Sequence, residues 1–475
     1  MKNRNLLASL AGWLVASVAT DAQTAVAPPK DGAVLLSPFT VTSEADQGYA
    51  ARETLAGTRF KSELKDVSAQ VSVMTKEFLE DNPRALQHAP FPSMTYSTRR
   101  HFIRTSAAAA LGSIAWPGRV LASGETVLPP HLKAFKGAYL KNPRQASLDW
   151  FRDAKFGLFI HYGLFSLDGI HPFEQLRLKI PVAEYEKKAA RFTAEKFDVG
   201  ALCDLAVEVG MKYVTLVAKH CDGFCLWDTK LSPFNSVRSA ARRDFVAEMV
   251  KACNERGLGF FAFYEFGFEW HHPHGPRKKD FPHPLTEVAY PSPEPTYAHG
   301  ADYDLNRYID YAHAQVEELL TRYGPIAGIW LDGVAAPLSG DRSRFRCQEL
   351  YDKIHRLQPH ALVSFKHGVT GTEDFYAPER FQLQHLKPGA TKPAELCESL
   401  NPAWGWVKGE KHMDADWVMP RLGFTRHHGM NYLLNIGPMP DGSVLPADLA
   451  TMKEVGRRIR ENGWPKGPDK LPDSE

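Results

Sequence analysis

The segment Tyr213-Val-Thr-Leu-Val-Ala-Lys219-His220-Cys221-Asp222 joins a short apolar run directly to a cluster of polar residues. An apolar run of this length, bounded by charged or turn-forming residues, predicts a parallel strand that is buried on both faces. Four other segments repeat the pattern and end in chemically active side chains: Phe156–Ile160 before His161, Gly259–Phe263 before Tyr264, Ile326–Leu331 before Asp332, and Ala361–Phe365 before Lys366 and His367. A β/α barrel gathers such strand ends around its active site, so the pattern favours an enzyme over a structural protein.

Helical patterns alternate with these strands. Apolar residues recur at spacings of three and four in five stretches: Val182–Phe192, Asp244–Arg256, Arg307–Tyr323, Arg344–Leu357 and Ala447–Asn462. The alternation predicts an α/β fold, a (β/α)8-type (TIM-like) barrel over residues 131–467 in which some helices are irregular or missing. The residues before the barrel are expected to be a mostly disordered leader.

Composition narrows the class of ligand. The chain has 475 residues with 57 Lys and Arg against 55 Asp and Glu, a formal charge of +2. This balance argues against nucleic acid or an anionic membrane surface as a partner. The six cysteines are scattered, and the cluster His271, His272 and His274 has no carboxylate or thiolate at ligand spacing. We therefore expect neither a bound metal nor a cofactor.

Two segments have the composition of export signals. Residues 1–22 combine a basic start with a short apolar run and small residues, as a secretory signal peptide does. Residues 94–122 contain Arg99 and Arg100 before a second apolar run and resemble a twin-arginine signal. Both runs are too short to span a bilayer, so no stable membrane insertion is expected. The expected location is that of an exported bacterial protein, periplasmic or extracellular.

Residues 23–93 resemble the N-terminal part of a TonB-dependent outer-membrane receptor, for example over Leu64–Leu79. No pattern of alternating barrel strands follows this fragment. We interpret it as a fused leader and expect the working protein to begin at Met94. The alternative is a genuine N-terminal interaction domain.

Seven motifs in order resemble glycoside hydrolase family 29, the α-L-fucosidases. They are Trp150–Gly163, Ala218–Asp228 with its Lys-His-Cys-Asp-Gly-Phe core, Glu269–Pro273, Arg322–Gly333, Glu373–Glu379, Trp404–Trp406 and Asn431–Pro438. The resemblance covers about 335 residues and implies a retaining exo-α-L-fucosidase that removes terminal fucose from glycans by double displacement. Asp332 matches the family's nucleophile and Glu379 its acid/base. A fucosylated glycan is then the expected substrate.

The resemblance also implies a set of sugar-binding residues: His161, His220, Tyr264, Trp227, Lys366 and Trp404. Three positions depart from the family pattern. Cys221 replaces a histidine, Lys366 stands where an arginine is expected, and the Glu-Trp pair expected near Pro172 is displaced. Each lost hydrogen bond to a sugar hydroxyl costs about 1–3 kcal/mol. A glycosidase for a related 6-deoxy sugar and a carbohydrate-binding pseudoenzyme therefore stay open as alternatives.

The sequence leaves several properties open. Many family members carry a C-terminal β-sandwich, and none is expected after residue 467. Linkage, leaving group and oligomeric state are not predicted.

Overall fold

The computed structural model describes residues 127–290, 296, 300–379 and 392–471, and the backbone of 53–54 and 62–63. The chain divides into two compact units, Met1–Val120 and Leu121–Glu475. In the first unit, β1 (Glu53–Thr54) pairs antiparallel with β2 (Ser62–Glu63). The signal-like stretches 1–22 and 94–122 and the rest of the receptor-like fragment 23–93 lie outside the described residues.

The second unit is built on a parallel sheet. Its strands are β3 (Phe156–Ile160), β4 (Tyr213–Lys219), β5 (Gly259–Glu265), β6 (Gly328–Asp332), β7 (Leu362–Phe365), β8 (Glu395–Ser399) and β9 (Asn431–Ile436). They pair in the order β7-β6-β5-β4-β3-β9-β8, and every pairing is parallel. The five apolar runs of the sequence are therefore strands, as predicted.

A short irregular segment joins the two edges of this sheet. Ser364 of β7 forms a parallel bridge with Phe375, and Glu379 forms one with Cys397 of β8. The Ala377 amide also donates to the Lys366 carbonyl, and the Cys397 amide donates to the Pro378 carbonyl. Pro378 has no amide hydrogen to donate, which keeps the pairing irregular. With 375–379 as an eighth strand position, the sheet closes into the predicted barrel.

Side chains alternate between the barrel interior and the helical layer, as strand geometry requires. The interior holds Phe159, Tyr213, Phe261, Trp330 and Leu433, with Trp150 and Phe151 of α4 (Pro143–Ala154) packed among them. Gly157 makes room for this packing, since a Cβ there would meet the Tyr213 ring at 2.3 Å. The outward residues face the helices in a second, larger apolar cluster.

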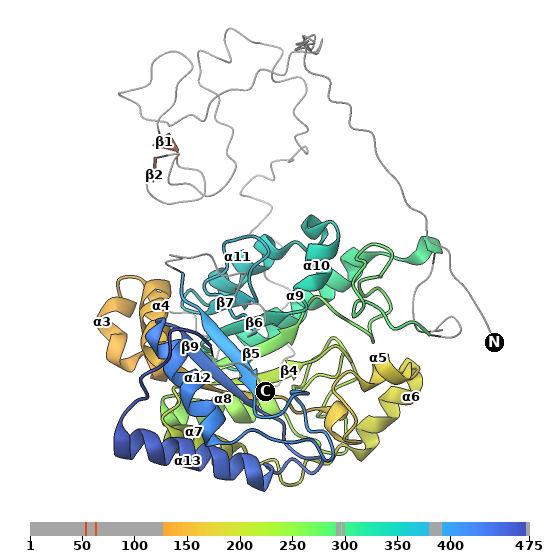
Figure 1. Cartoon of the computed structure of the whole chain (residues 1–475). Helices are drawn as coiled ribbons and strands as arrows, with labels where there is room; N and C mark the ends of the chain where they lie inside the picture. The colour runs from red at the N-terminus through yellow and green to blue at the C-terminus, as the bar shows by residue number, and fades with distance from the viewer. Residues whose placement is uncertain are drawn as a thin grey trace, which may run out of the picture. The chain divides into compact units, whose positions relative to one another are not determined.

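The larger helices flank the barrel, with α7, α8 and α13 on one side and α9, α10 and α11 on another (Figure 1). They are α7 (Val199–Val209), α8 (Phe245–Arg256), α9 (Leu305–Thr321), α11 (Cys347–Leu357), α12 (Ala415–His427) and α13 (Pro446–Asn462). Shorter elements are α3 (Lys136–Tyr139), α5 (Glu174–Leu178), α6 (Val182–Glu186) and α10 (Ala335–Ser339), with 3-10 turns η3 (Pro130–Phe135), η4 (Leu164–Ser166), η5 (Lys187–Arg191), η6 (Gly300–Asp302) and η7 (Arg342–Phe345).

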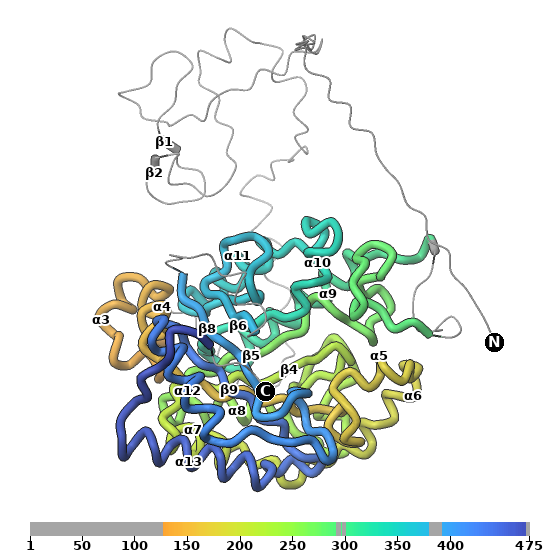
Figure 2. Tube along the Cα trace, viewed as in Figure 1, coloured from red at the N-terminus to blue at the C-terminus, as the bar shows by residue number. Residues whose placement is uncertain are grey.

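One expected helix is broken. The stretch Val182–Phe192 divides into α6 and η5, while the other four expected helices form close to their predicted bounds. Asp198 and Asp244 cap α7 and α8 by accepting from backbone amides of the first turn. Figure 2 shows that β4, β5 and β6 lie side by side in the centre of this unit.

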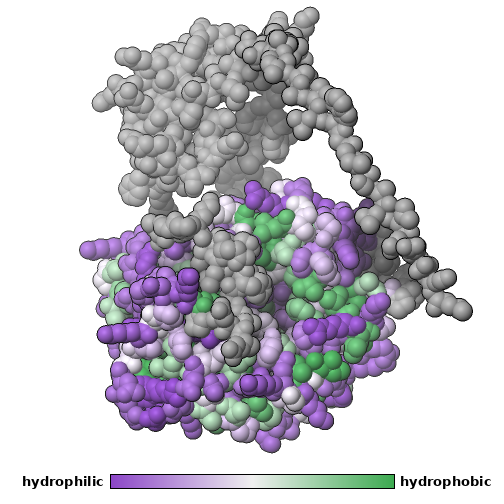
Figure 3. Space-filling model, viewed as in Figure 1, coloured by the Kyte–Doolittle hydropathy of each residue, from purple (hydrophilic) through white to green (hydrophobic). Residues whose placement is uncertain are grey.

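The outer face of the unit is largely polar. The side seen in Figure 3 is mostly hydrophilic and carries small, separated apolar areas. Within the described part of the chain, no helix has the length and apolar character needed to cross a bilayer.

Candidate active site

A pocket opens at the carboxyl ends of the barrel strands. Its polar lining residues follow the strands directly, as expected for the active end of such a barrel. The lining consists of Phe159, His161, His171, Pro172, Phe173, His220, Phe263, Asp332, Lys366, Glu379, Ala403 and Trp404. The structure thus brings together six of the eight predicted site residues: His161, His220, Asp332, Lys366, Glu379 and Trp404.

Lys366 bridges the two carboxylates in this pocket. Its Nζ lies 2.6 Å from Oε1 of Glu379 and 3.5 Å from Oδ1 of Asp332. Since both oxygens contact one nitrogen, they are separated by about 6 Å at most, which fits a retaining pair and falls short of the wider spacing of inverting glycosidases. The Gly333 amide also donates to Asp332 Oδ1 at 2.7 Å.

Charge in the pocket is unevenly compensated. Burial raises the pKa of Asp332, and Lys366 acts against that rise while Glu379 adds to it. Burial also opposes the charge on Lys366, but Asp332 and Glu379 outweigh it and raise the pKa of this ammonium. Lys366 is therefore a permanent cation that favours ionised carboxylates beside it.

A third carboxyl group lies behind Asp332. Glu265, at the end of β5, is opposite Asp332 in the register of β5 and β6 and is 2% exposed. Its Oε1 accepts from the Phe268 amide at 3.0 Å, and the Cys221 thiol donates to its Oε2 at 3.5 Å. Burial, followed by the charge of Asp332, raises the pKa of Glu265 to about 8. Glu265 is accordingly a neutral acid at neutral pH.

His161 presents a hydrogen-bond acceptor to the pocket. Its Nδ1 is 2.6 Å from Asn435 Oδ1, while Asn435 Nδ2 donates to Ser399 Oγ and the Trp404 carbonyl. Because the Asn435 oxygen faces the ring, His161 donates from Nδ1 and leaves the Nε2 lone pair for a ligand. Burial lowers the pKa of His161 to about 3, so the ring stays neutral.

His171 has the opposite polarity. Its Nδ1 accepts from the Phe173 amide at 2.9 Å, so the neutral ring carries its hydrogen on Nε2. Burial lowers the pKa of His171 to about 4. The nearby Glu174 contributes no carboxylate to the pocket wall, because it is buried and paired with Lys188. His171 and Phe173 thus occupy the wall where the family resemblance led us to expect a Glu-Trp pair.

Tyr264 does not line the pocket. It points outward from β5 into the helical layer, where its hydroxyl donates to Gln315 Oε1 at 2.8 Å. The Lys219 ammonium lies 4.6 Å from the centre of its ring and pairs with the buried carboxylate of Glu269. The inward neighbour Phe263 lines the pocket instead.

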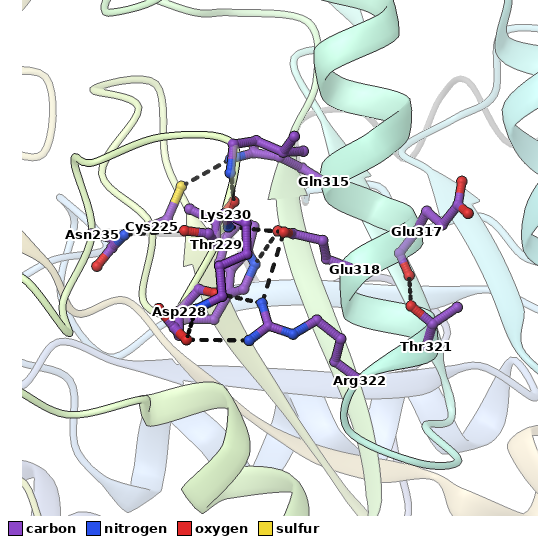
Figure 4. Close-up of polar contacts among 12 residues, drawn as sticks. Cys225, Asp228, Thr229, Lys230, Asn235, Gln315, Glu317, Glu318, Thr321 and Arg322 are labelled. Atoms are coloured by element: carbon purple, nitrogen blue, oxygen red, sulfur yellow. Dashed lines mark hydrogen bonds and ion pairs between the residues drawn. The ribbon is translucent and has the colours of Figure 1, made fainter. Parts of the chain in front are cut away.

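Trp227 also lies away from the pocket. It is fully buried, and its indole Nε1 donates to Glu318 of α9 at 3.0 Å. The segment around it is fastened to α9, where Glu318 accepts from the Lys230 amide and Arg322 pairs with Asp228 (Figure 4). The placement of Tyr264 and Trp227 in the sugar pocket is therefore corrected to a structural role in the layer between strands and helices.

Several pocket residues were missed in the sequence: Phe159, His171, Phe173, Phe263 and Ala403, with Glu265 and Asn435 behind them. Strand alternation supplies a signal for two of them, since Phe159 and Phe263 precede His161 and Glu265 by two positions on the inward face. Within the described residues, no group of three or more His, Cys, Asp and Glu side chains is arranged to hold a metal ion.

Comparison with known proteins agrees with this geometry. The sequence model for α-L-fucosidases matches residues 133–464. Tissue α-L-fucosidase of Rattus norvegicus is 29% identical over 352 residues, which cover 66% of this chain and 68% of that protein. Plasma α-L-fucosidase of Homo sapiens is 26% identical over 68% of this chain and 71% of its own length.

Two solved structures are similar in fold as well. α-L-Fucosidase isoenzyme 1 from Paenibacillus thiaminolyticus has a TM-score of 0.59 and 31% identity, with coverage of 68% of this chain and 77% of that one. α-L-Fucosidase AlfC from Lactobacillus casei, in complex with its α-L-fucose product, has a TM-score of 0.60 and 26% identity, with coverage of 66% and 98%. The chain belongs to the α-L-fucosidase family of glycoside hydrolases.

Proposed function

We propose that this glycosidase hydrolyses terminal α-L-fucosides with retention of configuration, with Asp332 as nucleophile and Glu379 as acid/base. The observation that carries the proposal is the pair of carboxylates bridged by Lys366 at the barrel mouth. A retaining glycosidase needs one ionised carboxylate and one proton donor at this spacing. The proposal holds for terminal sugars because the pocket encloses a single ring-sized space.

In the first step, an oxygen of Asp332 attacks the anomeric carbon while the glycosidic bond breaks. Glu379 transfers its proton to the departing oxygen, so the leaving group departs as a neutral alcohol. The products of this step are a fucosyl ester on Asp332 and an ionised Glu379. Lys366 stabilises the new negative charge on Glu379, which its ammonium contacts at 2.6 Å.

In the second step, water attacks the anomeric carbon from the side that the leaving group vacated. Glu379 accepts a proton from this water, and the bond between the sugar and Asp332 breaks. Two displacements restore the original configuration. Fucose leaves, Asp332 is again ionised, and Glu379 is again protonated.

The pocket walls suit a 6-deoxy sugar. The acceptor on His161 and the donor on His171 can bind ring hydroxyls, and the rings of Phe159, Phe263 and Trp404 form apolar surface for the methyl group and ring face. AlfC in complex with 4-nitrophenyl α-L-fucopyranoside provides a relative that binds such a substrate. We propose the same substrate class here.

The test is hydrolysis of 4-nitrophenyl α-L-fucoside by the full chain and by Asp332→Ala. Asp352→Ala, an exposed residue of α11, is the matched control. We expect release of nitrophenol by the unaltered and control proteins and a loss of at least about 10³-fold in Asp332→Ala. No release from several α-L-fucosides by the unaltered chain would favour a different 6-deoxy sugar or a binding protein.

We also propose export of the chain to the periplasm or beyond, supported by the signal-like composition of residues 1–22 and 94–122. Fractionation of a bacterial host that expresses the full chain checks this proposal. Replacement of Arg99 and Arg100 by lysine is expected to retain the protein in the cytoplasm if the second signal is used. Unchanged export in that variant, together with processing after residue 22, would assign export to the first signal.

A further inference from the structure

A second cavity adjoins the sugar pocket and shares two of its residues. It is lined by Glu379, Cys397, Glu398, Ser399, Asn401, Pro402, Trp404, Met413 and Trp417. Glu379 and Trp404 belong to both linings, so the two spaces meet at the proposed proton donor and one indole ring. The second space, about 520 Å³, is at least as large as the sugar pocket, about 430 Å³.

Trp404 is held firmly at this boundary. Its backbone adopts a left-handed φ of 69°, a conformation that costs energy for any residue other than glycine. The Trp404 carbonyl accepts from Asn435 Nδ2 at 2.7 Å, and the same amide group contacts Ser399 of the second cavity. One buried amide therefore connects His161 in the first space, Trp404 at the boundary and Ser399 in the second.

The far wall of the second cavity comes from the start of α12. Trp417 lies in its first turn, which Asp414 caps by accepting from the Trp417 amide at 3.0 Å. The Arg421 guanidinium stacks over the Trp417 ring at 3.9 Å, which orients the indole. An oriented indole is a surface on which the apolar face of a pyranose can stack.

The polar lining favours an uncharged ligand with hydroxyl donors. Glu398 and Glu379 contribute carboxylates, and Asn401 Nδ2 is engaged with the Gly405 carbonyl and Glu410. Among the described residues that line this cavity there is no Lys, Arg or His. An anionic sugar would therefore meet acceptors and negative charge without a cation.

We infer that this second cavity binds the leaving group of the substrate, and that the leaving group it fits is an uncharged sugar such as a hexose or an N-acetylhexosamine. The inference rests on the proposed function, because it places the scissile oxygen beside Glu379 between the two spaces. Trp417 is then a specificity-determining residue that contacts the leaving sugar and takes no part in the displacement at the anomeric carbon.

The test compares two substrates on Trp417→Ala. α-L-Fucosyl fluoride has a leaving group too small to occupy the cavity, whereas an α-L-fucosyl-N-acetylglucosamine disaccharide fills it. We expect Trp417→Ala to keep the kcat/KM for the fluoride within about twofold and to lower that for the disaccharide by roughly tenfold or more. Trp464→Ala is the matched control, since Trp464 also lies under an arginine ring contact and lines neither cavity.

The outcomes separate the inference from the proposed function. If the unaltered chain does not hydrolyse the fluoride, the proposed function itself is wrong. If Trp417→Ala hydrolyses both substrates as the unaltered chain does, or loses both equally, the leaving-group site is wrong. Faster cleavage of a disaccharide with a uronic acid as leaving sugar than of its neutral counterpart would overturn the assignment to an uncharged ligand.

Discussion

Lys366 is the residue on which the electrostatics of the site depend. Its ammonium contacts both carboxylates of the proposed reaction and is itself 4% exposed. The cation favours ionised Asp332, which the first displacement needs, and it receives the negative charge that forms on Glu379. A lysine carries this charge as a single point rather than as the fork of an arginine, so one nitrogen serves both oxygens.

Removal of the Lys366 charge is expected to shift the acid limb of the pH profile. Lys366 holds the pKa of Asp332 down against burial, so Lys366→Gln lets that pKa rise. A higher pH is then needed to ionise the nucleophile, and the acid limb of kcat/KM moves toward neutral pH. Lys366→Arg keeps the charge and serves as the control. An acid limb that does not move in Lys366→Gln contradicts this role.

Glu265 is expected to make the folded protein less stable as the pH rises. Its folded pKa, raised to about 8, lies above that of an unfolded glutamate, so the folded state holds an extra proton between about pH 4.5 and 8. The free energy of unfolding therefore falls across this window. Glu265→Gln, which is always neutral and keeps an acceptor for the Phe268 amide, removes that fall.

The measurement is the midpoint of urea unfolding for both proteins at several pH values. The unaltered protein should lose stability relative to Glu265→Gln by on the order of a few kcal/mol from pH 5 to pH 8.5. Glu269 gives a contrast, because its ion pair with buried Lys219 lowers its folded pKa against the effect of burial. A constant difference between unaltered protein and Glu265→Gln would show that Glu265 is ionised throughout.

At the scale of the element, the parity of each strand decides which side chains reach the pocket. In β5 the inward positions are Phe261, Phe263 and Glu265, whereas Tyr264 faces the helices. The same alternation brings Asp332 to the mouth two residues after inward Trp330. Gly333 then takes a φ of 81°, and a Cβ there would meet Glu265 Oε1 at 2.1 Å.

Tyr264→Phe separates a structural from a sugar-binding role for this tyrosine. The variant loses the hydrogen bond to Gln315, so the free energy of unfolding should fall by about 1 kcal/mol. KM for an α-L-fucoside should stay within about twofold, because the ring does not line the pocket. His161→Ala, which alters the pocket wall, provides the comparison. A several-fold rise in KM for Tyr264→Phe would return the residue to the site.

The strands and most helices could be predicted because their patterns are local. Buried runs such as Tyr213–Ala218 and the spacing in Asp244–Arg256 are visible without knowledge of any partner. The assignments of Tyr264 and Trp227 failed because a wholly apolar run hides which face of a strand is inward. The positions of Lys366 between two carboxylates and of Glu265 behind Asp332 depend on pairings between strands far apart in the chain.

At the scale of the whole molecule, the barrel closes through its least regular part. The segment 375–379 joins β7 to β8 by single bridges and places Glu379 at the mouth. This segment had no strand pattern in the sequence, since Pro378 interrupts it. The proposed proton donor therefore lies on the least repetitive part of the sheet, whereas Asp332 lies on a regular strand.

The barrel is expected to work without the first 93 residues. Its described part begins at residue 127, and the unit that contains it starts at Leu121. A chain that begins at Met94 should match the full chain in kcat/KM for an α-L-fucoside and in its urea midpoint. If only the full chain is soluble and active, the interpretation of residues 1–93 as a fused leader is wrong, and the segment is a working domain.

The measurement that tests the central claim most directly is chemical trapping of the nucleophile. A 2-deoxy-2-fluoro-α-L-fucosyl fluoride slows both displacements but lets the ester accumulate, because the second step is slowed more. Mass spectrometry of the digested full chain should then locate a single fluorofucosyl group on Asp332, with loss of activity in proportion to labelling. A label on Glu265 or Glu379, or turnover of natural fucosides that releases the inverted anomer with no label at all, would contradict the account.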